Sequence, residues 1–151
     1  MSCNGHWELR QATPTELRSV TALGLQLWHH HAVEELAQEF DALLHDPEAA
    51  VFLLAANGQD VGFAQCQLRH DYVEGTSGSP VGYLEGIYID PAHRRGGGAQ
   101  ALLRKCEDWA RTQGCREFAS DCELENTQSL RFHLAMGFTE ANRIICFTKK
   151  L

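Results

Sequence analysis

The sequence predicts one mixed α/β domain built around a central sheet, and three observations indicate this. The 151 residues are enough for one ordinary domain with its own buried core. Along the chain, apolar residues recur first at helical spacing and then at the alternating spacing of strands, so both kinds of element are expected. No internal repeat, low-complexity tract or break in composition divides the chain. We therefore expect residues 1–151 to form a single domain.

The N-terminal part is expected to contain a strand and two helices. Residues 6–11 alternate between polar and apolar side chains, as a strand does. Thr13 followed by Pro14 is typical of a helix start, with a capping threonine and a proline at the first helical position. The apolar face of this helix is formed by Leu17, Val20, Leu23, Leu27 and Trp28. A second helix is expected over residues 33–44, ending before Asp46.

The middle and C-terminal parts are expected to alternate strands with helices. Two strands, over residues 50–56 and 61–68, are joined by the hairpin turn Asn57-Gly58, and a third strand covers residues 81–89. The elements expected after them are a helix over 99–112, a strand over 117–120, a helix over 126–136 and a last strand over 144–148. The resulting order, β-α-α-β-β-β-α-β-α-β, indicates a single central sheet with helices on its faces.

The composition restricts the partners of the protein. Thirteen basic and 20 acidic residues give a formal net charge of −7, which opposes nucleic acid and favours a cationic small molecule. No apolar run approaches the roughly 20 residues that cross a bilayer. Residues 1–9 lack the basic-then-apolar order of a secretory signal. We therefore expect a cytoplasmic protein with neither a nucleic-acid nor a membrane partner.

The cysteines and histidines do not suggest a metal site. No two of the six cysteines form a Cys-x-x-Cys pair, so we expect reduced and mostly buried thiols at Cys3, Cys66, Cys106, Cys115, Cys122 and Cys146. Consecutive residues of a helix point in different directions, so the three imidazoles of His29–His31 would not meet at one ion. We expect no metal.

The most informative stretch is the turn Arg94–Ala99, which follows a predicted strand and opens a predicted helix. Its three consecutive glycines leave backbone N–H groups free of bulky side chains next to a helix N-terminus. Arg94 and Arg95 add positive charge that suits a pyrophosphate. The spacing is neither that of a P-loop nor that of the dinucleotide-binding fingerprint. These residues alone are therefore compatible with an anion cradle and with a flexible surface loop.

The turn resembles the Q/R-x-x-G-x-G/A signature with which acyltransferases of the GNAT superfamily hold the pyrophosphate of acetyl-CoA. The strand before it, the helix after it, Asn126 at a helix start and the block 135–138 also follow the GNAT order. The resemblance covers nearly the whole chain. It implies the GNAT fold, a central mixed and mostly antiparallel sheet with a splayed strand pair, flanked by helices.

A narrower resemblance links the chain to the aminoglycoside 6'-N-acetyltransferases of one bacterial subgroup. It rests on the blocks 68–75, 79–81, 84–87, 114–117, 119–121 and 125–127, and on the spacing of His133, Gly137 and Phe138. It implies acetyl transfer from acetyl-CoA to the 6'-amine of aminoglycoside antibiotics, and hence resistance, by a homodimer. Two alternatives remain: an acetyltransferase for another amine, such as a polyamine or a peptide N-terminus, and an acyl-CoA-binding sensor without turnover.

The resemblance also implies which residues bind acetyl-CoA. The backbone of Ile87, Tyr88 and Ile89 is expected to pair with the pantetheine arm, and one of its N–H groups to stabilise the oxyanion. The pyrophosphate is expected to bind Arg94, Arg95, Gly96, Gly97, Gly98 and Ala99. Asn126 is expected to hydrogen-bond the cofactor where two strands separate.

A cationic substrate calls for carboxylates and flat apolar surface in its cleft. By resemblance, Glu85 and Asp121 contact the substrate amines; Glu85 is our first choice and Asp121 our second for the base that removes a proton before attack. Trp28, Tyr72 and His31 are expected to line the cleft. The alternatives are solvated surface carboxylates for the two acids and plain core packing for Trp28.

Two positions depart from the family pattern. His133 stands where many GNAT enzymes have a tyrosine that protonates the departing thiolate, a role that histidine can fill near neutral pH. Asn142 stands where related members tend to have an acidic residue that contacts substrate, which affects the preferred drug more than the reaction. The expected mechanism is direct attack by the neutral amine in a ternary complex, with no acyl-enzyme on Cys122.

Overall fold

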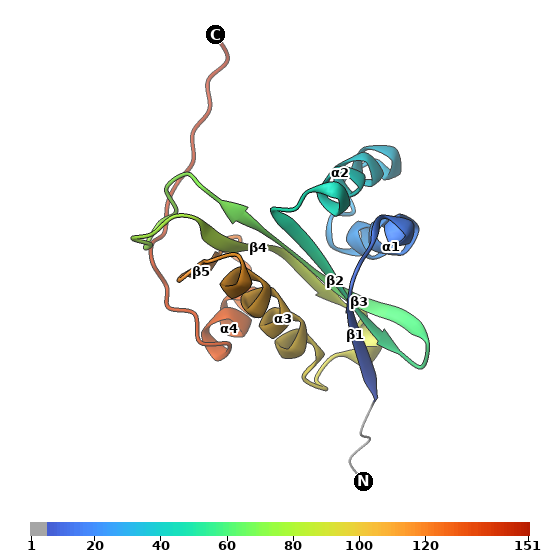
Figure 1. Ribbon diagram of the computed structural model, residues 1–151. Coiled ribbons are helices and arrows are strands. Elements are labelled where there is room, and N and C mark those ends of the chain that lie inside the picture. Colours follow the sequence, from blue (N-terminus) through green and yellow to red (C-terminus); the bar gives the residue numbers. More distant parts are fainter. Residues whose placement is uncertain (1–5) are drawn as a thin grey trace.

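The computed structural model describes residues 6–151 (Figure 1). Within this range the elements are β1 (Trp7–Gln11), a 3₁₀ turn (Pro14–Glu16), α1 (Leu17–Leu27), α2 (Val33–His45), β2 (Ala49–Ala56), β3 (Gln59–Arg69), β4 (Val81–Ile89), a second 3₁₀ turn (Pro91–His93), α3 (Gly98–Thr112), β5 (Phe118–Ser120) and α4 (Thr127–Ala135). Up to α4, this order confirms the one expected from the sequence.

The five strands form one mixed sheet in the order β1-β2-β3-β4-β5. The first three pairings are antiparallel, and β4 pairs with β5 in parallel. The parallel pairing joins only Gly82–Leu84 to Phe118–Ser120, although β4 continues to Ile89. The two strands therefore separate beyond Leu84, which is the splayed pair that the resemblance implied.

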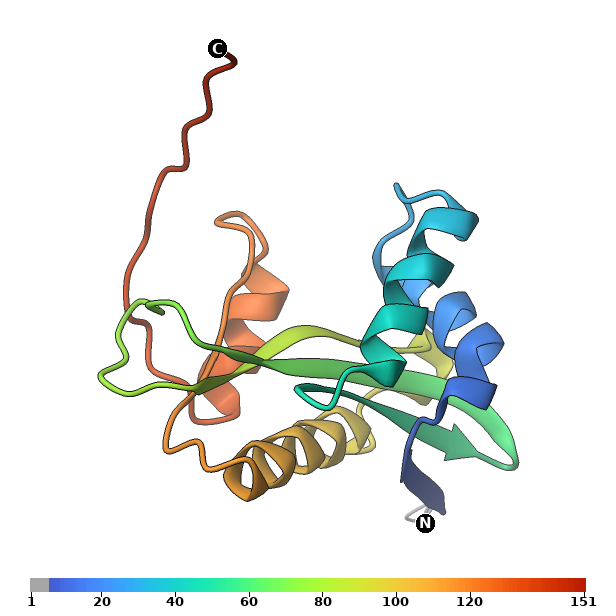
Figure 2. The same ribbon diagram turned by 45° about the horizontal axis from the view of Figure 1, so that its top comes forward.

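Helices cover both faces of the sheet. In Figure 2, α1 and α2 lie on one side of the strands and α3 lies on the other. On the α1–α2 side the buried core includes Val20, Phe40 and Phe63, and on the α3 side it includes Leu102 and Cys106. Residues of α4 and the chain after it, Phe132, Met136 and Phe138, pack against the α3-side core.

Local signals account for the first turns of the chain. The backbone N–H of Thr13 donates to the Glu16 carboxylate at 3.0 Å, so the predicted cap opens the 3₁₀ turn that leads into α1. Asn57 and Gly58 both have positive φ angles, 52° and 78°, as a two-residue turn needs when its twist matches that of the strands. The sequence prediction is confirmed at both places.

The expected last strand, residues 144–148, is absent from this structure. Beyond Phe138 the chain is extended and leaves the body of the protein without pairing to a strand (Figure 1). Ile144, Ile145 and Phe147 are 64%, 79% and 86% exposed. The strand prediction is wrong for the single chain because a strand is stable only when a neighbouring strand accepts its backbone hydrogen bonds.

The described cysteines are free thiols. Cys66, Cys106 and Cys115 are buried, Cys122 is half-buried and Cys146 is exposed, so most of them lie where the sequence analysis expected; Cys3 is outside the described residues. In the part of the chain that the structure describes, no helix combines the length and apolar character needed to cross a membrane.

Candidate functional site

The separation of β4 from β5 exposes one edge of β4. Ile87, Tyr88 and Ile89 pair with β3 on one side, but pairing with β5 ends at Leu84. The backbone of β4 beyond Leu84 therefore offers N–H and C=O groups to an extended ligand, which can bind as an added strand. This is where the sequence analysis expected the pantetheine arm.

The glycine turn lies at the end of this open edge. Gly97 is the N-cap of α3 and has a φ angle of 85°, a conformation that glycine adopts without strain. A Cβ atom at Gly98 would lie 2.7 Å from the Leu54 side chain and 3.1 Å from that of Ile89. The turn is therefore packed closely against the sheet, and it presents the N-terminus of a 15-residue helix to an anion.

The two arginines of the turn lie differently. The Arg94 Nε donates to the carbonyl oxygen of Ile89 at 2.7 Å, and its guanidinium lies 5.7 Å from the centre of the Tyr88 ring. Arg94 thus ties the turn to the end of β4. Arg95 is exposed, with a φ angle of 68° that is uncommon for a residue with a side chain.

A pocket of about 320 Å³ lies between the α1–α2 pair and strands β3 and β4. It is lined by Trp28, His31, Leu36, Glu39, Phe40, Leu43, Gln65, Gln67 and Glu85. Three residues that the sequence analysis assigned to the substrate cleft, Trp28, His31 and Glu85, therefore meet in one place. Glu39, Gln65 and Gln67 were not identified from the sequence.

Trp28 belongs to the core and to the pocket at once. Its ring centre lies 6.0 Å from that of Phe40 and 5.9 Å from that of Phe63. A Cβ atom at Gly86 would come within 2.5 Å of the indole, so the glycine in β4 makes room for it. The core packing expected for Trp28 is therefore confirmed, and its contact with a substrate stays a prediction.

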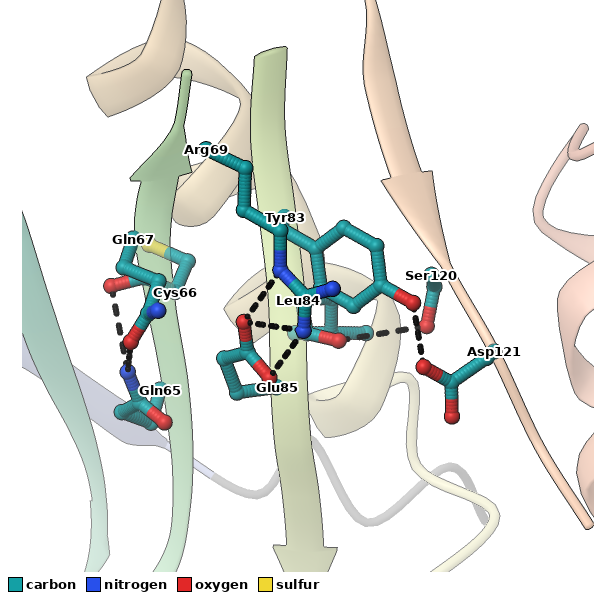
Figure 3. A network of polar contacts seen from close by, with 9 residues as sticks. All are labelled: Gln65, Cys66, Gln67, Arg69, Tyr83, Leu84, Glu85, Ser120 and Asp121. Atoms are coloured by element: carbon teal, nitrogen blue, oxygen red, sulfur yellow. Dashed lines mark hydrogen bonds and ion pairs between the residues drawn. The ribbon is translucent and has the colours of Figure 1, made fainter. Parts of the chain in front are cut away.

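Glu85 is held by Arg69, as Figure 3 shows. Arg69 Nε and Nη2 donate to Glu85 Oε1 at 3.0 and 2.9 Å, and Nη2 also donates to Oε2 at 2.9 Å. The Arg69 guanidinium lies 3.4 Å from the centre of the Tyr83 ring. Burial raises the pKa of Glu85 above its ordinary value, and the hydrogen bonds and charge of Arg69 oppose this rise.

Asp121 joins the same group of side chains. The Tyr83 hydroxyl donates a hydrogen bond to the Asp121 carboxylate (Figure 3). Burial and this hydrogen bond raise the pKa of Tyr83, so it remains a neutral donor. Glu85 and Asp121, the two predicted acids, are thus connected through Arg69 and Tyr83, which the sequence analysis did not identify.

His133 lies against the last residue of β5. Its Nδ1 is 2.7 Å from the Ser129 carbonyl oxygen, which can only accept, so Nδ1 carries a hydrogen. Its Nε2 is 2.8 Å from the Ser120 hydroxyl, which also lies 3.3 Å from the carbonyl oxygen of Leu84. A neutral ring accepts from Ser120, whereas a protonated ring donates to it and Ser120 donates to Leu84. His133 therefore reaches the point where β4 and β5 separate.

The remaining predicted residues lie elsewhere. The Asn126 side-chain oxygen accepts from the Ser129 backbone N–H at 3.0 Å and so caps α4. Tyr72 is 76% exposed in the loop before β4, and Asn142 Nδ2 donates to Glu74 at 3.4 Å in the segment after α4. Neither Tyr72 nor Asn142 lines the 320 Å³ pocket.

With this fold and this site, the chain belongs to the acetyltransferase (GNAT) family, whose model matches residues 7–138. An aminoglycoside N(6')-acetyltransferase type 1 of Stenotrophomonas maltophilia is 46% identical over 146 residues, which are 95% of this chain and 93% of that protein. One of Salmonella enteritidis is 38% identical over 143 residues, 95% of this chain and 99% of that protein.

Solved structures agree with these relatives. The aminoglycoside N-acetyltransferase AAC(6')-Iy in complex with CoA has a TM-score of 0.94 and 37% identity, covering 100% of this chain and 99% of that one. AAC(6')-Iy with the bisubstrate analogue CoA-S-monomethyl-acetylneamine has a TM-score of 0.93 and 38% identity, covering 97% and 99%. The prediction of the GNAT fold is confirmed.

Proposed function

We propose that the protein transfers the acetyl group of acetyl-CoA to the 6'-amine of aminoglycoside antibiotics and thereby confers resistance to them. One observation carries this proposal. The open edge of β4 runs from Glu85, in the acidic pocket, to the glycine turn at the start of α3. A ligand extended along that edge would have its phosphates at the turn and its other end beside a pocket suited to an amine.

The glycine turn and the open edge fit coenzyme A. The turn leaves no space for side chains at Gly98, as a close approach of phosphate oxygens to the backbone requires. We propose that residues 94–99 bind the pyrophosphate, that Ile87–Ile89 pair with the pantetheine arm, and that the free amide group of Asn126 contributes a hydrogen bond. When bound, acetyl-CoA supplies the reactive thioester.

The pocket suits a polycationic sugar. Glu39 and Glu85 present carboxylates, and Trp28 offers a flat apolar wall on which a sugar ring can stack. We propose that these residues bind the aminoglycoside together with His31 and Asp121. Tyr72 and Asn142, on segments outside the pocket, would contact its more distant rings. The relatives of Stenotrophomonas maltophilia and Salmonella enteritidis are both aminoglycoside N(6')-acetyltransferases, which supports this substrate class.

The chemistry we propose is direct attack in a ternary complex. Glu85, or Asp121 in its place, accepts a proton from the substrate ammonium, and the neutral amine attacks the thioester carbon. A backbone N–H of β4 stabilises the oxyanion, and proximity lowers the barrier by roughly 7–11 kcal/mol. We propose that His133, whose Nε2 contacts the Ser120 hydroxyl, donates a proton to the departing thiolate of coenzyme A.

We further propose that residues 1–151 form one domain and that two copies associate as a homodimer. The exposed apolar side chains of Ile144, Ile145 and Phe147 support the dimer, because a second copy would remove them from water. Since the acetyl donor is a central metabolite, we place the enzyme in the cytoplasm.

Release of free thiol from acetyl-CoA tests the function. We expect turnover with tobramycin and kanamycin at kcat/KM values at least tenfold above those with spermidine or an N-terminal peptide. The acetylated product should carry its new group on the 6'-nitrogen, as fragmentation by mass spectrometry would reveal. If spermidine or the peptide is the better substrate, the drug assignment fails. Binding of acetyl-CoA by calorimetry, without thiol release for any amine, would indicate a sensor.

A further inference from the structure

Arg69, a cation, is bonded to Glu85, an acid of the pocket that we assign to a cationic substrate. We propose that Arg69 is a positioning residue that keeps Glu85 ionised and fixed in one orientation before the amine arrives. The identity of the amine rests on the proposed function, whereas the effect of Arg69 on Glu85 is a property of the protein alone. Arg69, on β3, and Glu85, on β4, come from neighbouring strands.

The contact has a geometry that few other pairs of side chains can make. Two nitrogens of the planar guanidinium engage both oxygens of the carboxylate, at 2.9 to 3.0 Å. The flat face of the Arg69 guanidinium also stacks on Tyr83, whose ring centre lies 3.4 Å away. Because Tyr83 restrains the guanidinium, Arg69 fixes the plane of the Glu85 carboxylate as well as balancing its charge.

Without Arg69, two influences would favour the protonated form of Glu85. The first is burial, because its side chain is only 20% exposed. The second is the negative charge of Asp121, which lies on the far side of Tyr83 and raises the pKa of Glu85. A protonated Glu85 would neither attract an ammonium nor accept its proton. Arg69 opposes both influences.

The other charged and titratable groups around Glu85 do not replace Arg69. From the α1–α2 side the pocket presents His31 and Glu39, and Tyr83 remains a neutral hydroxyl. Glu39 adds further negative charge, and a histidine is cationic only when protonated. Among the residues lining the pocket or bonded to Glu85, Arg69 is the permanent cation.

The test compares Arg69→Gln with Arg69→Lys. In wild type, kcat/KM for tobramycin should fall as the pH drops through the pKa of Glu85. In Arg69→Gln the pKa of Glu85 rises, so this fall should begin at a pH higher by about one unit or more. Arg69→Lys keeps the charge but loses the planar fork, so we expect a smaller shift in pH together with a reduced kcat. The exposed Arg111→Gln, in α3, is the matched loss of charge and should leave the profile unchanged.

A second readout does not depend on activity. The carboxyl carbon of Glu85 in the free protein, assigned by comparison with Glu85→Gln, should titrate by NMR at a higher pH in Arg69→Gln than in wild type. If the thermal midpoint falls but neither titration moves, Arg69 only joins β3 to β4 and the inference is wrong. If the NMR midpoint moves while tobramycin is not acetylated, the inference stands and the proposed substrate fails.

Discussion

At the scale of single residues, a substitution at Asp121 should affect turnover of the substrate but not binding of acetyl-CoA. It accepts the Tyr83 hydroxyl hydrogen, and in our proposal it faces the amine rather than the phosphates. Asp121→Asn keeps the size of the side chain but removes its charge. We expect kcat/KM for aminoglycosides to fall by about 10²-fold, as for loss of a group that handles protons or binds a cation, while the Kd for acetyl-CoA from calorimetry stays within twofold.

The control for this change is Asp108→Asn. Asp108 lies on α3, is 70% exposed and pairs with Arg111, so the substitution removes the same charge away from the pocket. It should alter neither rate nor affinity, because exposed ion pairs contribute little. Equal loss of substrate turnover and cofactor affinity in Asp121→Asn would place Asp121 at the cofactor and contradict the assignment.

At the scale of elements, the two ends of α3 provide a matched pair of glycines. Gly97 at its start and Gly114 just beyond its end have φ angles of 85° and 89°. Valine at either position strains the backbone by about 1–2 kcal/mol. Only Gly97 lies in the proposed pyrophosphate turn. We expect Gly97→Val to raise the Kd for coenzyme A at least tenfold in calorimetry, and Gly114→Val to leave it unchanged.

Both variants carry the same backbone strain, and Gly97→Val also brings a Cβ atom to 3.3 Å from the Trp7 side chain, so it should lose more thermal stability than Gly114→Val. Affinity is therefore compared at a temperature at which both variants are folded. If either valine variant fails to fold, Gly97→Ala and Gly114→Ala give the same comparison with smaller side chains. An unchanged Kd in Gly97→Val would contradict the assignment of this turn to the pyrophosphate, because a strained residue here, in contact with Trp7, should shift the backbone N–H groups that bind the phosphates.

Elements whose signals are local could be predicted from the sequence, and those that depend on register could not. The Asn57-Gly58 hairpin and the Thr13 cap are fixed by neighbouring residues. Arg69 meets Glu85 only because β3 and β4 align as they do, with an irregularity of register between Gln65 and Cys66. Such a pairing is a property of two strands together, and the alternation within either strand does not reveal it.

At the scale of the whole molecule, the pattern over residues 144–148 predicted a strand that the single chain does not form. Alternation indicates that a segment can pair, but it does not indicate which strand accepts it. β5 is an edge strand of three residues, and the chain after α4 leads away from the body (Figure 1). Residues 144–148 are therefore a segment with strand character and no partner strand within residues 6–151.

Association of two copies would give this segment its partner and bury its apolar side chains. Ile145 and Phe147 lie two residues apart and so share one face of an extended chain, at 79% and 86% exposure. Ile145→Asp places a charge on that face, which would have to be desolvated on association. We therefore expect wild type to have the mass of two chains in light scattering at micromolar concentration, and Ile145→Asp to have the mass of one.

Val33→Asp is the matched change for this experiment, since Val33 is 52% exposed at the start of α2, away from the C-terminal segment. It should leave the mass at two chains, because a new charge there meets water in either state. A single-chain mass for wild type would contradict the dimer. A two-chain mass for Ile145→Asp would instead place the interface elsewhere, since a buried and unpaired aspartate on the proposed face would not be tolerated.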